Sequence, residues 1–374
     1  MASQNLSYKR YQRQLILNEF GGEGQQKLSE ASVLVVGAGG LGCPALQYLT
    51  AGGVGRIGII DDDRIALHNL HRQILYTTDD IGLLKAEVAE KRLRCMNPEV
   101  QFRIYPVRLD NKNALGIITD YHFVVDATDN FATRYIVNDA CVLLDKPLIY
   151  GAISMFEGQV AIFNVAEAGQ RVNYRHLFPK APEPGSVLNC AEAGVMGVLP
   201  GIIGTMQAAE TIKLIIGIGK PLVNQLLTYN LLRNESVVFD LTANADTELG
   251  LPKNWKEFEE LDYGWFCEGR TESVYEIDVH EFNSVLDKTA TVIIDVREEG
   301  ERPRITEFPH LNIPLSRLKA DIPAIEHDTV IVFCQTGKRS AEAAKILSST
   351  FGSTKKILSL KGGITNWKLN GKEA

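Results

Sequence analysis

The sequence predicts an α/β protein with two domains, a large doubly wound sheet followed by a small α/β domain. Short apolar runs, closed by glycine or aspartate, alternate with segments of helical spacing, as in parallel strands joined by helices. This alternation starts again near residue 274, after a polar and irregular stretch. The length of 374 residues also suits two domains of ordinary size.

The elements of the first domain alternate between strand and helix. The first strand is Ser32–Val36, and a glycine-rich turn leads from it into a helix over about residues 41–51. Arg56–Ile60 is the second strand, and Lys85–Met96 has apolar positions at helical spacing. The remaining elements are strands at Phe123–Val125, Pro147–Tyr150 and Val160–Phe163, and a helix at Gly201–Ile216. This order is typical of a mostly parallel, doubly wound sheet.

The second series of elements predicts the smaller domain. It comprises strands at Val292–Ile294, Val330–Phe333 and Ile357–Leu360, and a helix at Ser340–Thr350. Residues 242–271 between the two series are polar, aromatic and irregular. We therefore expect a first domain over residues 1–245, a linker over 246–271 and a second domain over 272–374.

Composition and charge exclude several classes of protein. Apolar residues make up 45% of the chain and charged residues 23%, which excludes a disordered or coiled-coil protein. The net charge of −7 argues against a partner nucleic acid. Charged residues interrupt the most apolar stretch, 194–219, so we expect a buried helix and no membrane span. Six cysteines without a C-x-x-C pair, and a start unlike a signal peptide, predict reduced thiols in the cytoplasm.

The turn Gly37-Ala-Gly-Gly-Leu-Gly42 is the first candidate site. Its four glycines, Gly37, Gly39, Gly40 and Gly42, let the backbone approach a phosphate, and the N-terminus of the next helix attracts the anion. Asp61 ends the next strand, 19 residues past Gly42, where a carboxylate can accept hydrogen bonds from ribose hydroxyls. The pattern predicts a Rossmann-like nucleotide-binding domain, and it fits NAD as well as ATP.

Polar residues downstream favour a triphosphate. Asn69-Leu-His-Arg-Gln73 and Lys85 bring two cations, Arg72 and Lys85, and two amides, Asn69 and Gln73, toward the same edge of the sheet. A dehydrogenase needs no such cluster, whereas cleavage of a triphosphate requires that charge on the leaving group be offset. Asp129, beside Asn130 and after a buried strand, is a suitable magnesium ligand.

Together these motifs resemble the MoeB/ThiF family, the ancestral group of the ubiquitin-activating enzymes. The resemblance covers about residues 6–245 and rests on Tyr11-Gln-Arg-Gln14, Gly37–Gly42, Asp61, Asn69–Gln73, Lys85 and Asp126-Ala-Thr-Asp-Asn130. It implies an enzyme that uses ATP and Mg²⁺ to adenylate the C-terminal Gly-Gly carboxylate of a ubiquitin-like sulfur carrier, MoaD- or ThiS-like.

The resemblance also implies roles for single residues. Asp61 would bind the ribose, and Arg13 resembles an arginine that reaches across a homodimer into the ATP site of the other subunit. The residues expected at the phosphates or their magnesium are Gly40, Asn69, Arg72, Lys85 and Asp129.

One feature of the family is missing from the sequence. Many members hold a structural zinc with two C-x-x-C pairs, of which the first should fall at Asn173 and His176. The second should fall at Tyr263–Cys267, where only Cys267 is a cysteine. His176 and Cys267 would be two ligands of the four that a closed site needs, so we expect no zinc.

Cys190 follows a proline-rich loop and has two interpretations. It resembles the position that in relatives forms a covalent link to the carrier, and a helix N-terminus behind it would lower its pKa. Alternatively, it is a small apolar residue of the loop.

Cys334 has the more specific context, in Cys334-Gln-Thr-Gly-Lys-Arg-Ser340 between a buried strand and a helix. Backbone N–H groups around Gly337 and Ser340, the helix dipole and Arg339 would favour a thiolate or a persulfide. The C-x4-R loop is shorter than the C-x5-R loop of phosphatases and suits sulfur. With Asp295-Val-Arg297, Gly362, Gly363 and Trp367, residues 272–374 resemble a rhodanese domain, although the continuation Glu298–Pro303 departs from it.

The two halves predict one reaction sequence, in which a carboxylate is activated as an adenylate and sulfur converts it to a thiocarboxylate. A persulfide donor such as a cysteine desulfurase would load Cys334. The first pathway to consider is molybdopterin synthesis, and thiamine synthesis or tRNA thiolation would use the same chemistry. The alternatives are an NAD-dependent oxidoreductase and a non-catalytic scaffold that binds the carrier.

Overall fold

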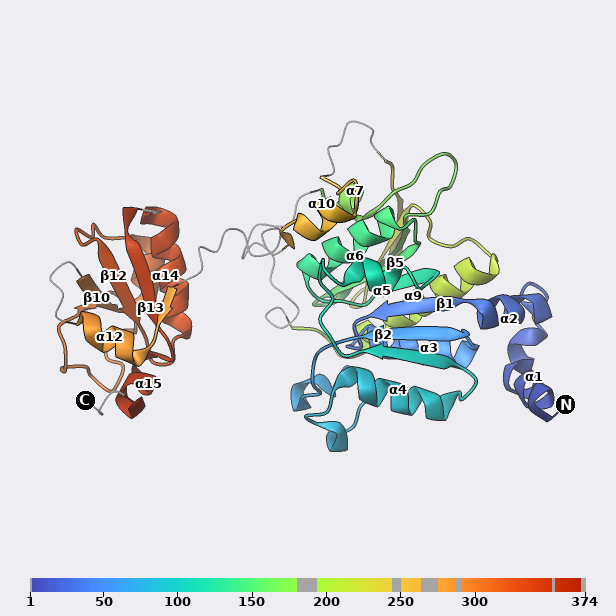
Figure 1. Ribbon diagram of the computed structural model, residues 1–374, viewed down its shortest axis with the longest axis horizontal. Coiled ribbons are helices and arrows are strands. Elements are labelled where there is room, and N and C mark those ends of the chain that lie inside the picture. Colours follow the sequence, from blue (N-terminus) through green and yellow to red (C-terminus); the bar gives the residue numbers. More distant parts are fainter. Residues whose placement is uncertain are drawn as a thin grey trace. The chain divides into compact units, whose positions relative to one another are not determined.

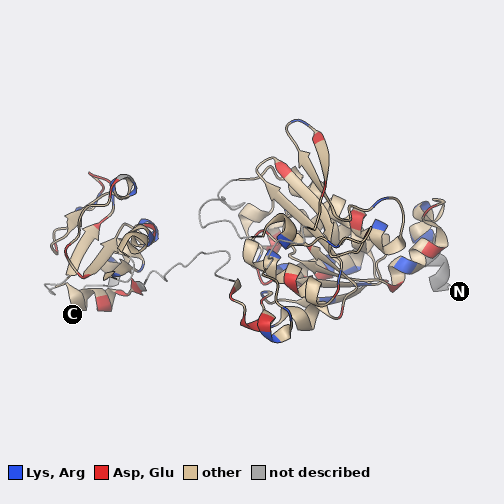
Figure 2. Ribbon diagram, turned by 90° about the horizontal axis from the view of Figure 1, so that it is seen from above, with Lys and Arg blue, Asp and Glu red and all other residues tan. Residues whose placement is uncertain are grey.

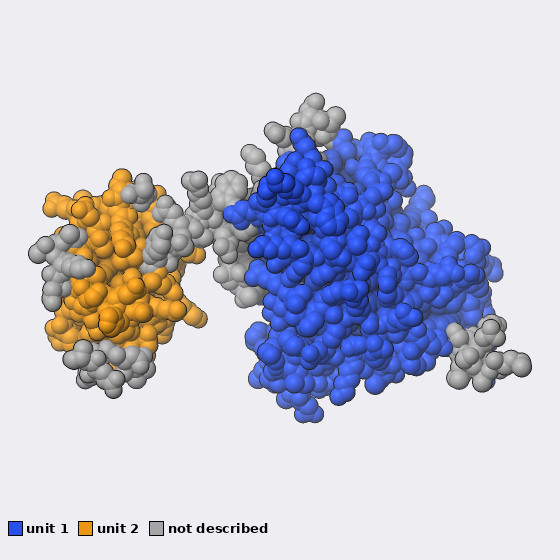
Figure 3. All heavy atoms as spheres, in the orientation of Figure 1, with its two compact units in different colours: residues 1–269 blue, residues 270–374 orange. Residues whose placement is uncertain are grey.

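The chain folds into two compact units, Met1–Gly269 and Arg270–Ala374 (Figure 3). The computed structural model describes residues 2–179, 194–243, 250–263, 275–286, 291–351 and 354–370. Lys and Arg residues alternate with Asp and Glu residues along the ribbons of both units (Figure 2). No helix in these ranges is both long enough and apolar enough to cross a membrane.

The first unit is built on one eight-stranded sheet with the order β3-β2-β1-β4-β5-β6-β7-β8 (Figure 1). The strands from β3 to β5 pair in parallel, and β6, β7 and β8 add an antiparallel end. The strands are β1 Ser32–Val36, β2 Arg56–Ile60, β3 Gln101–Tyr105, β4 Phe123–Asp126, β5 Leu148–Ser154, β6 Glu157–Phe163, β7 Gln225–Asn230 and β8 Glu235–Asp240.

Helices pack on both faces of this sheet, as the apolar residues of β1 require. Val33 and Val35 belong to one buried cluster, and Leu34 and Val36 belong to the other, because successive side chains of a strand point to opposite faces. The first cluster contains residues of α2 (Gly21–Glu30), α3 (Gly42–Gly52), α4 (Lys85–Met96) and α9 (Val198–Ile216). The second contains residues of α5 (Ala114–Ile118), α6 (Phe131–Leu143), α7 (Tyr174–Leu177) and α10 (Trp255–Glu260). The doubly wound fold is confirmed, and α1 (Ala2–Leu15) precedes it.

The structure differs from the predicted linker at α10. This helix lies within residues 246–271, and Phe258 and Tyr263 are buried in the core of the first unit. Asn254 caps the helix by accepting a hydrogen bond from the backbone N–H of Glu257. The pattern Asn254-x-x-Glu257 indicates the start of a helix, but the polar sequence around it favours a linker.

The second unit is a five-stranded parallel sheet with the order β11-β10-β12-β13-β9. Its strands are β9 Tyr275–Ile277, β10 Thr291–Asp295, β11 Leu311–Asn312, β12 Thr329–Phe333 and β13 Lys356–Leu360. Its helices are α12 Val279–Val285, α13 Leu315–Ala320, α14 Lys338–Phe351 and α15 Gly363–Asn370. Separate apolar clusters cover the two faces, as the small α/β prediction requires.

Candidate functional site

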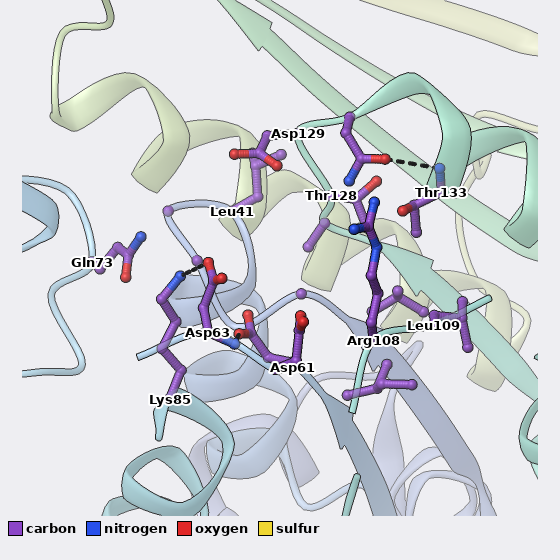
Figure 4. Close-up of a pocket in the computed structure, with 18 of the residues that line it drawn as sticks. Leu41, Asp61, Asp63, Gln73, Lys85, Arg108, Leu109, Thr128, Asp129 and Thr133 are labelled. Carbon is purple, nitrogen blue, oxygen red and sulfur yellow. Dashed lines mark hydrogen bonds and ion pairs between the residues drawn. The ribbon is translucent and has the colours of Figure 1, made fainter. Parts of the chain in front are cut away.

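A pocket opens at the carboxyl ends of β1, β2 and β4 (Figure 4). The glycine loop after β1, the acidic turn after β2 and the turn after β4 all line it. The strand order reverses between β1 and β4, and ligands of doubly wound sheets bind at such a point. The fold therefore places the predicted nucleotide site where this architecture binds nucleotides.

The glycine loop is held tightly in place. Gly37 has a φ of +95°, and a Cβ there would lie 2.8 Å from the carbonyl oxygen of Ala127. A Cβ on Gly42 would lie 1.9 Å from the carbonyl oxygen of Gly37, so this glycine permits the turn itself. Asp61 Oδ2 accepts a 2.8 Å hydrogen bond from Ala38 N, and the Tyr76 hydroxyl donates a 2.8 Å bond to the Ala38 carbonyl. These contacts fix the conformation of the loop at the pocket.

Asp61 stands at the end of β2, beside the loop. Its second oxygen, Oδ1, accepts a 2.9 Å hydrogen bond from Asp63 N. Burial raises the pKa of the Asp61 carboxyl above its usual value, and Lys85 opposes this rise. Both oxygens retain lone pairs that can accept from ribose hydroxyls.

Lys85 and Arg72 bring positive charge to the pocket. Lys85 is the first residue of α4, and its Nζ lies 2.7 Å from Asp63 Oδ2 (Figure 4). The Lys85 side chain is 6% exposed and that of Asp63 is 69% exposed. The Arg72 guanidinium donates a 2.9 Å hydrogen bond to the His68 carbonyl. An incoming phosphate can take the place of the exposed Asp63 carboxylate beside the buried Lys85.

The turn after β4 forms the opposite wall. The buried Asp126 carboxylate accepts hydrogen bonds from the backbone N–H of Thr128 at 3.0 Å and its hydroxyl at 2.6 Å. Asn130 Oδ1 accepts from Thr133 N at 2.9 Å and caps α6. These bonds fix the turn and leave Asp129 exposed at the pocket.

Two buried polar atoms of the pocket have no hydrogen-bond partner among the residues that the structure describes. They are Gln73 Oε1 and Arg134 Nε, whose residues are 3% and 7% exposed. A buried polar group without a partner is unfavourable, so each calls for an explanation. A polar ligand in this pocket would supply the missing partners.

Not every predicted residue lines the pocket. Asn69 is buried and is absent from the pocket lining. Its side chain accepts a 3.1 Å hydrogen bond from Ala66 N. Its backbone carbonyl accepts hydrogen bonds from the N–H groups of Arg72 and Gln73. Arg13 is exposed on α1 and is absent from the pocket lining of its own chain. The predicted residues that do line the pocket are Gly37, Gly39, Gly40, Asp61, Arg72, Gln73, Lys85, Asp129 and Asn130.

Sequence reasoning missed four charged residues of the pocket, which are Asp62, Asp63, Arg108 and Arg134. Arg134 lies one turn after Asn130 in α6, and its guanidinium donates a 3.1 Å hydrogen bond to the Thr128 carbonyl. Arg134 is four positions after Asn130, the residue that caps α6, and this helical spacing could have indicated that both side chains lie at the same end of the helix. Arg108 follows β3, which the sequence analysis did not identify as a strand.

The second candidate site lies after β12. Cys334 is 1% exposed, and its sulfur accepts a hydrogen bond from the backbone N–H of Gly337 at 3.2 Å. Gly337 has a φ of +93°, which favours glycine at this point of the loop. Ser340 is buried, and its hydroxyl donates a 3.0 Å bond to the Gly337 carbonyl. The loop therefore directs one backbone N–H at the sulfur, and the predicted persulfide cradle stays a prediction.

Arg339 is engaged by a carboxylate. Its Nη2 lies 2.8 Å from Glu301 Oε2, and a second bond joins the same two groups. This pairing lowers the pKa of Glu301 to about 2. Glu301 belongs to the stretch Glu298–Pro303 that departs from the expected pattern. Arg297, in turn, forms a buried ion pair with Asp295 at 2.6 Å.

The remaining predicted positions concern zinc and Cys190. Asn173 caps α7, and the His176 ring nitrogen Nδ1 accepts a 3.1 Å hydrogen bond from Asn173 N. Within the described ranges, no group of three His, Cys, Asp or Glu side chains is arranged to hold a metal ion. Cys190 and Cys267 lie outside the described residues, so the absence of zinc stays a prediction.

Comparisons with known proteins match a family model to each part of the chain. The sequence model of the ThiF family matches residues 11–250, and that of the rhodanese-like domain matches residues 278–370. The chain is 58% identical to the sulfur carrier protein adenylyltransferase of Thermus thermophilus over 261 residues, 69% of this chain and 96% of that protein.

Two further relatives extend over nearly the whole chain. The probable adenylyltransferase/sulfurtransferase MoeZ of Mycobacterium tuberculosis is 38% identical, with 96% of this chain and 92% of the relative covered. The probable molybdopterin-synthase adenylyltransferase of Porphyra purpurea has the same identity and the same coverage. Among solved structures, E. coli MccB is similar in fold, with a TM-score of 0.56 at 23% identity over 64% of this chain and 74% of that chain.

Proposed function

Because the chain belongs to the ThiF family and continues into a rhodanese-like domain, we propose that it activates a ubiquitin-like sulfur carrier and then delivers sulfur to it. The first unit would adenylate the C-terminal carboxylate of the carrier, and the second unit would supply the sulfur. The names of relatives that extend over both units support this pairing of an adenylyltransferase with a sulfurtransferase.

The first step is the transfer of AMP to the carboxylate. A carboxylate oxygen of the carrier attacks the α-phosphorus of ATP, the bond to the bridging oxygen breaks, and pyrophosphate leaves with that electron pair. Two anions must meet for this to happen, so the enzyme has to position and neutralise them. Lys85 and Arg72 are the described cations beside the glycine loop that suit this role.

The pocket also has a group that suits magnesium. Asp129 is exposed at the pocket, and carboxylate oxygens are preferred ligands of this ion. We assign Asp129 to the metal, and Mg²⁺, when bound, offsets negative charge on the phosphates. Lys85 and Arg72 would act on the same phosphates from the other walls.

A homodimer would complete the site with Arg13. Large apolar side chains near α1 and α3 are exposed, including Ile16 at 62%, Leu17 at 54% and Tyr48 at 55%. Tyr48 and Ile74 also line an apolar groove against α9. Burial of these side chains favours association. We propose that a second copy covers them and directs its Arg13 to this pocket.

The carrier would dock on the antiparallel end of the sheet. All six residues of the edge strand β8 are exposed, among them Val237, Val238 and Phe239 at about half of their full exposure. Exposed Met155 pairs with Val195, which lines the nucleotide pocket. We propose that an apolar surface of the carrier covers β8 and that its C-terminal tail runs past Met155 to the pocket.

Sulfur transfer would follow at Cys334, loaded by a persulfide donor such as a cysteine desulfurase. The terminal sulfur of the persulfide attacks the acyl carbon, and AMP leaves with the electron pair of the broken C–O bond. A second thiolate then attacks Cys334 Sγ, which releases the thiocarboxylate and leaves a protein disulfide. We propose Cys190 for this thiolate, and a cellular dithiol then reduces the disulfide. The cysteines that the structure describes are free thiols, in agreement with a cytoplasmic location.

The main support for the proposal is that Lys85, Arg72 and Asp129 line the same pocket as the glycine loop. An NAD-dependent oxidoreductase would leave these groups without a purpose, and a non-catalytic scaffold would not need them. The molybdopterin pathway is favoured by the name of one relative, and carriers of thiamine synthesis or tRNA thiolation would undergo the same reaction.

ATP–pyrophosphate exchange tests the proposal. We expect exchange that requires both Mg²⁺ and a carrier ending in Gly-Gly, and a carrier without the last glycine is the control. A thermal shift with NAD and none with ATP would contradict the proposal. Comparison of MoaD-like and ThiS-like carriers in the same assay identifies the pathway.

A further inference from the structure

We infer that Arg175, Asp139 and Tyr263 form a clamp that fastens residues 250–263 beside the nucleotide pocket and so fixes where the connection to the rhodanese-like domain begins. The inference rests on the proposed sulfur transfer between the two units. In this inference, Arg175, Asp139 and Tyr263 position the chain for sulfur delivery and have no part in adenylation.

The core of the clamp is a buried ion pair joined by two hydrogen bonds. Arg175 Nε donates to Asp139 Oδ1 at 2.8 Å, and Arg175 Nη2 donates to Asp139 Oδ2 at 2.6 Å. The side chains are 1% and 0% exposed, respectively. The Tyr263 hydroxyl donates a 2.9 Å bond to Asp139 Oδ2, and burial raises the pKa of this phenol, so it remains a donor. Asp139 thus joins α6, α7 and the end of the fastened segment.

Other contacts hold the same segment in place. Phe258 is fully buried and packs on Tyr263, with 5.5 Å between the ring centroids. Asn111 Nδ2 donates to the carbonyl oxygens of Glu259 at 2.7 Å and Leu261 at 3.0 Å. The segment therefore belongs to the first unit, although the sequence suggested a linker.

The fastened segment lies next to the nucleotide pocket. Leu261 and Tyr263 line a second hollow together with Arg108, Leu109 and Thr133. The last three residues also line the nucleotide pocket. The connection to the second unit consequently starts at a hollow that shares residues with the nucleotide pocket.

The clamp lies where the family pattern predicts a metal cross-link. Arg175 stands between Asn173 and His176, the positions expected for the first C-x-x-C pair, and Tyr263 opens the stretch expected for the second. In relatives with both pairs, zinc would join these two segments. Here, a carboxylate, a guanidinium and a phenol join them.

The clamp shortens the connection between the units. Eleven residues, 264–274, separate Tyr263 from β9, and they span about 40 Å at most when extended. If residues 250–263 were released, 31 residues, 244–274, would separate Ala243 from β9. Effective concentration falls with roughly the −3/2 power of linker length, so release would lower it roughly fivefold.

The test releases the segment and follows each step separately. In the full chain, the double variant Tyr263→Ala/Phe258→Ala should keep normal ATP–pyrophosphate exchange and normal loading of Cys334 with persulfide. Single-turnover formation of thiocarboxylate from the loaded enzyme should slow roughly fivefold. Hydrogen exchange should show faster exchange in residues 252–263. Tyr263→Phe, which removes only the hydroxyl, should show a smaller change of the same kind.

Trp255→Ala is the matched control, because Trp255 lies on the same helix and is 50% exposed. It should leave all of these rates unchanged. Continued protection of residues 252–263 in the double variant would overturn the clamp, and so would an unchanged transfer rate after their release. Failure of exchange or persulfide loading in the unaltered chain would instead overturn the proposed function.

Discussion

Lys85 Nζ lies 2.7 Å from Asp63 Oδ2 at the edge of the nucleotide pocket, and these two residues come from different elements. Lys85 opens α4, whereas Asp63 belongs to the acidic turn after β2. The ion pair holds a nearly buried amine in place at the pocket. In the proposed reaction, this lysine would exchange the Asp63 carboxylate for a phosphate of the nucleotide.

The first prediction concerns this lysine. Lys85→Ala should lower carrier-dependent ATP–pyrophosphate exchange by about 10²–10³-fold, because it removes a charge that faces the reacting phosphates. The exchange rate at saturating ATP is the measurement. Lys91→Ala removes an exposed lysine of the same helix and should have no effect. Equal exchange rates in the two variants would remove Lys85 from the site.

The second prediction concerns the role of Arg13 across the proposed dimer. Arg13→Ala and Asp129→Ala should each be inactive in exchange, yet a mixed dimer should regain one working site of two. The intact Arg13 of one subunit would then act beside the intact Asp129 of the other. Exchange by isolated heterodimers, at about half of the normal rate, is the expected result. Inactive heterodimers would mean that Arg13 does not act across the interface.

The third prediction concerns the pH dependence of the second unit. The pKa of Glu301 is lowered to about 2 by Arg339, from an ordinary value of 4.5. The pair therefore stabilises the folded state above pH 4.5, and this contribution is lost as the pH falls toward 2. The difference in free energy of unfolding between the unaltered chain and Glu301→Gln should shrink over that interval.

Denaturant titrations of both proteins, monitored through hydrogen exchange of the β12 amides, measure this difference. Lys319 and Glu342 form an exposed ion pair in the same unit, so Glu342→Gln serves as the comparison and should show a weaker dependence on pH. A difference for Glu301→Gln that does not change between pH 6 and 2.5 would show that the ion pair contributes no pH-dependent stability.

The sequence was sufficient for those parts of the fold that local pattern determines. The bounds of β1, β2 and α4 agree with the apolar runs and the helical spacing. The glycine loop, Lys85 and Asp129 were found because each follows directly after a predicted strand or begins a predicted helix.

Relationships between distant residues could not be predicted in this way. Arg175 and Asp139 are 36 positions apart, and neither stands in a pattern that indicates a buried ion pair. Tyr263 is 124 positions from Asp139, in a stretch whose polar composition resembles a linker. Only the packing of α6, α7 and α10 brings these residues together.

The central claim is that one chain divides the reaction, with adenylation in the first unit and sulfur delivery through Cys334 in the second. The most direct measurement is the mass of the carrier after reaction of Cys334→Ala with ATP, Mg²⁺ and a persulfide donor, with ATP–pyrophosphate exchange followed in parallel. Cys95→Ala, at an exposed free cysteine of α4, is the control. We predict normal exchange in both variants, thiocarboxylate with Cys95→Ala and none with Cys334→Ala. Donor sulfur reaching the carrier at the normal rate in Cys334→Ala would contradict the account.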